Sequence, residues 1–74
     1  MLIIKNNSII IKFNKNFYRK KSVEETIKAY KKLCTATIKN QKNYFLIELY
    51  PKQKEINLKT ISLEFSNYVL SLER

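Results

Sequence analysis

The hydrophobic residues at the start of the chain alternate in a way that predicts two β-strands. Leu2 to Lys5 and Ser8 to Phe13 are rich in isoleucine, and Asn6-Asn7 lies between them. Asparagine tolerates a positive φ angle better than most residues, so this pair suits a two-residue hairpin turn. The second strand divides its side chains into two faces, with Ile9, Ile11 and Phe13 on one and Ile10 and Lys12 on the other. A hairpin is the expected structure; the alternative is a frayed first segment followed by one strand.

After a polar, basic turn from Asn14 to Lys21, the pattern changes to that of a helix. Ser22 and Glu25 have the spacing of a capping box, with Ser22 as the N-cap and Glu25 binding back to it. Apolar side chains then recur at spacings of four, three and four, which predicts an amphipathic helix of about three turns. This stripe consists of Val23, Ile27, Tyr30 and Cys34. We interpret Cys34 as a small buried hydrophobic residue, although Lys31 and Lys32 would lower its pKa if it were exposed.

The second half of the chain predicts a hairpin and a final helix. Thr35 to Lys39 and Tyr44 to Tyr50 alternate as strands around a polar turn at residues 40–43. Pro51 ends the second strand because it has no backbone N–H. Asn57 is the expected N-cap of the helix. Its apolar stripe, which we expect to be largely buried, consists of Leu58, Ile61, Phe65, Tyr68 and Leu72.

The order strand–strand–helix–strand–strand–helix predicts a single α+β domain over residues 1–74. Both helices are expected on one face of an antiparallel sheet. The other face would then carry Tyr44, Leu46 and Tyr50, which is unusually apolar for a face in contact with water. Two explanations are open: the N-terminal segment wraps part of this face, or a partner or second copy covers it.

The residue types that the chain lacks exclude several classes of protein. The 74 residues include no His, Asp, Gly or Trp, and one Cys. Without His the usual general base near neutral pH is missing, and without Gly there is no phosphate-binding loop. One Cys forms neither an internal disulfide nor a structural zinc site. We therefore expect a binding or accessory protein that is not an enzyme and has no metal or cofactor.

The hydrophobic runs are too short for a membrane segment. The aliphatic runs are as short as Ile9-Ile10-Ile11, whereas a spanning helix needs about 20 apolar residues. The opening residues 1–5 are too short for a secretory hydrophobic region and have no small-residue cleavage site. The expected location is the cytoplasm.

The net charge of +9 is concentrated in the first part of the chain. Residues 1–42 carry eleven positive and two negative side chains, and residues 43–74 carry four of each. A coding bias toward Lys, Asn and Ile would produce a lysine-rich surface without any partner. A one-sided positive field would, in contrast, speed the encounter with an acidic partner. Both interpretations are open.

Two kinds of binding surface are compatible with this composition. A small sheet with a free edge accepts an extended peptide as an additional strand. Thr37 belongs to the predicted edge strand, and the basic side chains of Arg19, Lys20 and Lys21 would attract an acidic peptide.

The alternative is a small basic protein that binds nucleic acid or has another regulatory role. Lysine and arginine residues between positions 12 and 21 interleave with Phe13, Phe17 and Tyr18. Such interleaving is typical of surfaces that bind single-stranded nucleic acid. A subunit of a small homo-oligomer is a further alternative, because the sequence does not reveal the oligomeric state.

The end of the chain resembles the HxsD family, the small proteins of the His-Xaa-Ser peptide-maturation system. The signature is an Asn, a Leu-x-Leu step and a terminal charged pair, which here is in the reverse order: Asn67, Leu70, Leu72, Glu73 and Arg74. The opening is similar too, with an Ile-Lys-Phe strand, a Tyr and a Ser-capped helix. The resemblance implies a radical SAM enzyme and a ribosomally made precursor peptide as partners. By analogy with related systems, it implies that the protein presents the leader peptide to the enzyme.

Overall fold

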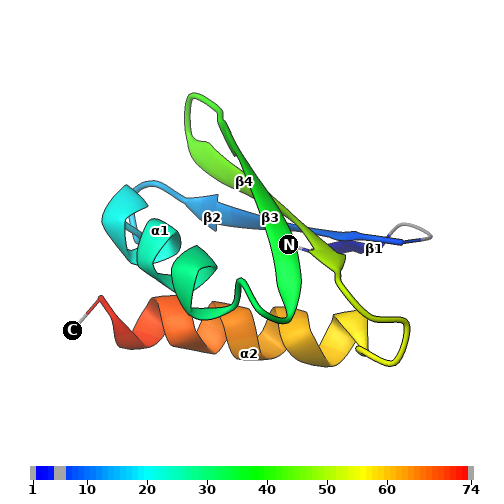
Figure 1. The fold of residues 1–74 in the computed structure, drawn as a ribbon. Coiled ribbons are helices and arrows are strands. Elements are labelled where there is room, and N and C mark those ends of the chain that lie inside the picture. The colour runs from blue at the N-terminus through cyan, green and yellow to red at the C-terminus, as the bar shows by residue number, and fades with distance from the viewer. Residues whose placement is uncertain (1, 5–6, 74) are drawn as a thin grey trace.

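The computed structural model describes residues 2–4 and 7–73, and within them the chain forms four strands and two helices. In chain order these are β1 (Leu2–Ile4), β2 (Ile9–Asn14), α1 (Lys20–Ala29), β3 (Cys34–Asn40), β4 (Tyr44–Pro51) and α2 (Leu58–Ser71). The strands form one antiparallel sheet in the order β1-β2-β4-β3 (Figure 1). The predicted α+β class and the predicted order of elements are confirmed.

Both helices lie on the same face of the sheet, and the opposite face is left uncovered (Figure 1). Helix α2 packs against β2 and β4, whereas α1 packs mainly against α2. The N-terminal strand β1 pairs with β2 from Leu2↔Ile11 to Ile4↔Ile9 and extends the sheet sideways. The first explanation for the open face is therefore wrong for residues 2–4, because they form an edge strand instead of wrapping over the sheet.

The core lies between the sheet and α2. Strands β2 and β4 place six side chains on the helix-covered face, each no more than 6% exposed: Ile9, Ile11, Phe13, Phe45, Ile47 and Leu49. From α2, Ile61, Phe65 and Val69 are buried against them. The Phe65 ring lies 6.2 Å from the Phe13 ring and 5.6 Å from the Tyr30 ring. The predicted stripe is thus core at its centre, while Tyr68 near the end of α2 is 41% exposed.

The predicted capping box of the first helix is wrong. Helix α1 begins at Lys20 with Arg19 as its N-cap, and Ser22 is buried within the first turn. The Glu73 carboxylate, at the far end of the chain, accepts a hydrogen bond from the Arg19 backbone N–H at 2.9 Å. In a capping box this bond goes to a glutamate three residues after the N-cap. Here a tertiary contact takes that role, and Glu25 is exposed.

The first helix also ends earlier than predicted, at Ala29, so that Cys34 is the first residue of β3. Cys34 is nevertheless buried, as expected, and its backbone N–H donates to the Tyr30 carbonyl at 3.0 Å. Strand β4 continues through Pro51, one residue further than predicted. Pro51 has no partner on β2, because the pairing of β2 with β4 begins at Ile9↔Leu49. Its missing N–H therefore removes no hydrogen bond between these two strands.

The two remaining local predictions have different outcomes. Residues 5–8 connect β1 to β2, and residues 5–6 lie outside the described part of the chain, so the proposed Asn6-Asn7 turn lies partly outside it. Asn57 is the N-cap of α2, as predicted. Its side chain accepts a hydrogen bond from the Thr60 backbone N–H at 3.0 Å.

Candidate functional site: the free edge of strand β3

Strand β3 is at the edge of the sheet, and its register shows which backbone groups face outward. At the two ends of the β3–β4 pair, the Gln41 N–H donates to the Tyr44 carbonyl and the Lys52 N–H to the Leu33 carbonyl. Antiparallel pairs alternate between hydrogen-bonded and non-hydrogen-bonded positions. The odd-numbered residues of β3 therefore bond to β4. The even-numbered residues direct their N–H and C=O groups away from the sheet.

This alternation changes the role of Thr37. Thr37 is exposed and lies in the edge strand, as predicted, opposite Glu48. Its backbone groups, however, belong to the ladder with β4. The outward-facing groups beside it are those of Ala36 and Ile38. The sequence indicates the strand but not these two residues, because their direction depends on the pairing register.

A groove runs beside this edge, between β3 and α1. It has a volume of about 400 Å³ and is lined by Glu24, Ile27, Lys28, Ala36 and Ile38. Three of these side chains are apolar, and that of Ile38 is 37% exposed. The groove exists because α1 packs mainly on α2 and leaves the helix-side surface of β3 partly uncovered. An added strand would thus find backbone partners along β3 and an apolar hollow beneath it.

The charge around this edge is predominantly positive. Lys28 lines the groove, and Lys31 and Lys32 are exposed in the connection that leads from α1 into β3. Lys39 is exposed within β3 itself, and Glu24 is the acidic residue of the groove lining. Clustered lysines raise the local concentration of acidic partners and speed their association.

The predicted basic cluster lies at a different place, where α1 begins and α2 ends. Arg19 is held there, with its Nε 3.3 Å from Glu73 Oε1 and its Nη2 3.1 Å from the Leu72 carbonyl. Lys20 and Lys21 are exposed on the first turn of α1. Arg19, Lys21 and Leu72 help to line a hollow of about 260 Å³, which does not include Thr37. The structure therefore divides the predicted site between two regions.

Glu73 is the centre of this contact between the helices. The Ser22 hydroxyl and the Arg19 backbone N–H hold the pKa of the Glu73 carboxyl below its ordinary value, despite some loss of hydration. The Ser22 oxygen is buried and makes no hydrogen bond of good geometry within the described residues. Its effect on Glu73 is therefore that of a nearby dipole, whereas the Arg19 contacts are direct hydrogen bonds.

The other residues of the HxsD-like ending have unequal environments. Asn67 and Leu70 are exposed on α2, and Leu72 is half-buried at its C-cap. Arg74 lies outside the described residues. Leu72 and Glu73 thus have structural contacts with the start of α1, and Asn67 and Leu70 are accessible to a partner.

The aromatic residues expected to stack on nucleic acid do not form one surface. Phe13 is buried in the core, and the Tyr18 ring packs edge-on against it at 5.1 Å. Phe17 is 72% exposed, while Lys12 is on the opposite face of the sheet from Phe13. Their interleaving in the sequence does not become a stacking platform in space.

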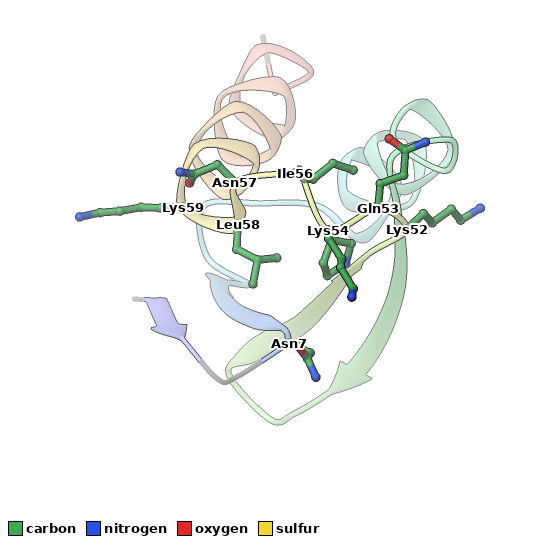
Figure 2. A pocket seen from close by; sticks show the side chains of 9 residues that line it. Asn7, Lys52, Gln53, Lys54, Ile56, Asn57, Leu58 and Lys59 are labelled. Carbon is green, nitrogen blue, oxygen red and sulfur yellow. The ribbon is translucent and has the colours of Figure 1, made fainter.

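Another hollow lies at the connection between β4 and α2, with a volume of about 610 Å³. Figure 2 shows Leu58 and Asn7 at separate points of its lining, and the Lys52 and Lys59 side chains extend away in different directions. It lies beside the capped start of α2, and its polar side chains do not converge on one point. We therefore regard the β3 edge as the better candidate site.

The part of the chain that the structure describes offers few other reactive or metal-binding groups. Burial raises the pKa of the Cys34 thiol, partly offset by the positive charge of Lys52. Residues 2–4 and 7–73 contain no group of three or more His, Cys, Asp or Glu side chains suited to a metal ion. Within the same residues, neither helix is long and apolar enough to cross a membrane.

Comparison with known proteins adds no relative to this description. No protein-family model, curated protein or solved structure matches the chain. The resemblance to the HxsD family therefore remains a hypothesis that rests on the residues of the chain itself.

Proposed function

We propose that this protein is a non-catalytic, cytoplasmic accessory protein that binds an extended segment of a ribosomally made precursor peptide. The peptide would add to the free edge of β3 and be presented to a radical SAM maturase. The observation that carries the proposal is the outward direction of the Ala36 and Ile38 backbone groups above an apolar groove. The HxsD-like ending supports the choice of peptide and enzyme.

In strand addition, backbone hydrogen bonds provide affinity and side-chain contacts provide specificity. Main-chain hydrogen bonds to Ala36 and Ile38 hold the peptide in register. Alternate peptide side chains turn toward Ile27 and the groove, which favours apolar residues at every second position. Side chains between them lie nearer to Lys39, which favours acidic residues there. The expected ligand is an extended segment in which apolar and acidic residues alternate.

The alternative of nucleic-acid binding has less support, because Phe13 and Tyr18 are used in packing. It makes a distinct prediction. Affinity for a single-stranded oligonucleotide would fall with salt at a slope of about −0.7 per phosphate contacted. Submicromolar binding at physiological salt would favour this alternative over the peptide.

Titration calorimetry with a candidate precursor peptide tests the proposal. Ala36→Pro removes an outward N–H and places a ring at the edge, so it should weaken binding strongly. Ala36→Ser keeps the N–H and is the matched control. The proposal fails if the peptide gives no heat and the maturase modifies it equally well without this protein. It also fails if the two variants bind the peptide alike.

A further inference from the structure

The uncovered face of the sheet carries a second surface, which borders the β3 edge and shares Lys39 with it. Its apolar side chains come from three strands and are half-buried or exposed: Ile3, Ile10, Tyr44, Leu46 and Tyr50. Tyr44 and Tyr50 are 37% and 40% exposed. A hollow of about 170 Å³ on this face is lined by Ile10, Thr37, Lys39, Leu46 and Glu48, and so reaches from β2 to β3. Large exposed apolar side chains grouped on one face mark an interaction site more often than isolated ones do.

Two lysines flank strand β4 on this face. The register sets Lys12 of β2, Leu46 of β4 and Lys39 of β3 side by side in one row across the sheet. Two strand spacings separate the lysine backbones, a distance of about 10 Å. The Lys12 ammonium lies 5.1 Å from the centre of the Tyr44 ring, on the same face. The result is an apolar strip along β4 with a cation on each side.

We propose that this face binds an amphipathic helix of a partner protein, with acidic residues on both sides of the helix's apolar stripe. An α-helix with its side chains is about 10–12 Å wide, which matches the separation of the two lysines. Its apolar stripe would lie along β4 on Tyr44, Leu46 and Tyr50. Its carboxylates would reach Lys12 on one side and Lys39 on the other. Glu48, which lies between Leu46 and Tyr50 on this strand, accepts a hydrogen bond from the Ser8 hydroxyl.

A second copy of the chain and a nucleic acid are less suited to this face. A second copy would carry a further net charge of +9 and would bring its own lysines toward Lys12 and Lys39. For a nucleic acid, the Lys12 ammonium already lies over the Tyr44 ring, and Ile3, Ile10 and Leu46 offer no aromatic surface for stacking. An acidic amphipathic helix satisfies both the apolar strip and its flanking charges.

Two synthetic peptides of about 20 residues test the inference, since that length supports helix formation. Both have the same leucine stripe, flanked by glutamates in one and by lysines in the other. NMR chemical-shift mapping with the glutamate peptide should perturb Tyr44, Leu46 and Tyr50. The double variant Lys12→Glu/Lys39→Glu should weaken its binding by about tenfold. The control Lys54→Glu/Lys59→Glu makes the same change in net charge at the exposed connection before α2 and its first turn, and should leave binding unchanged.

Several outcomes would overturn the inference. One is equal binding of the lysine-flanked peptide, and another is equal weakening by the control variant. Perturbations confined to Ala36 and Ile38 would place the peptide at the β3 edge instead. Sedimentation showing a dimer that Leu46→Glu dissociates would assign the face to a second copy. An oligonucleotide that perturbs the same signals at physiological salt, where the glutamate peptide does not, would assign it to nucleic acid. Thermal melts verify that each variant is folded.

Discussion

Strand β4 contributes side chains to both faces of the sheet, and the two sets differ in burial. On β4, Phe45, Ile47 and Leu49 are almost fully buried beneath α2, while Tyr44 and Tyr50 on the other face remain accessible. Both faces are apolar, so hydrophobicity alone does not separate core from surface here. The difference is the helix layer, which covers one face and leaves the other to water. The covered face supplies folding free energy, and we assign the open face and its adjacent edge to partners.

The largest expected effect comes from removing the centre of the covered face. Phe65→Ala should destabilise the protein by about 3–5 kcal/mol, because the ring is fully buried between Phe13 and Tyr30. A core this small rarely supplies more than about 3–5 kcal/mol in total, so the variant should be largely unfolded. Circular dichroism during a thermal melt measures this. Leu63→Ala, at a residue that is 55% exposed on the same helix, is the control. A melt of Phe65→Ala close to wild type would contradict the assigned core.

Substitutions at neighbouring residues of β4 compare how much each face contributes to the free energy of unfolding. Ile47→Ala should cost about 2–5 kcal/mol because it leaves a cavity beneath α2. Leu46→Ala should cost less, since its side chain is only half-buried and water fills the space. Urea denaturation of both variants gives the two free energies of unfolding. Equal losses would show that the open face is covered in solution.

Two proline substitutions in β3 test which backbone groups face outward. Thr37→Pro removes a donor from the β3–β4 ladder and should destabilise by about 1–3 kcal/mol. Ala36→Pro removes a donor that faces solvent, as tolerated on edge strands, and should change stability less. The same urea experiment compares them. If Ala36→Pro is the more destabilising variant, the assigned register of the ladder is wrong.

The smallest expected effect concerns the contact between Glu73 and the start of α1. The pKa of Glu73 is lower in the folded protein, so its contacts stabilise the fold above the ordinary glutamate pKa. This stabilisation is lost as the pH falls through the folded-state pKa. Glu73→Gln should therefore lower the melting temperature slightly at neutral pH and have little effect in acid. Glu55→Gln, at an exposed site before α2, is the control. A Glu73→Gln effect that is independent of pH would exclude a role for the carboxylate charge.

Local patterns predicted those features that depend on nearby residues. The alternation around Ile47 identified the strand and its two faces, and Asn57 identified the start of α2. The position of α1 was misjudged because Glu73, 54 residues from Arg19, completes its N-terminus. The outward direction of Ala36 was also beyond the sequence, since it depends on the strand with which β3 pairs. Both features depend on contacts between residues that are far apart in the sequence.

The groove beside β3 could not be predicted for a related reason. It exists because α1 rests mainly on α2, which leaves Ile38 partly exposed beside Ile27. The spacing of apolar residues predicts that a helix has a buried face, but not which element covers it. Likewise, Arg19 belongs to a basic run in the sequence, yet its guanidinium is engaged with Glu73 in the fold.

Amide hydrogen exchange, followed by NMR with and without the precursor peptide, tests the central claim most directly. In the free protein, the amides of Ala36 and Ile38 should exchange faster than those of Thr37 and Lys39, which belong to the ladder with β4. Saturating peptide should slow exchange at Ala36 and Ile38 and leave Thr37 unchanged. Exchange at Ala36 and Ile38 that stays fast while the peptide is bound would contradict strand addition at β3.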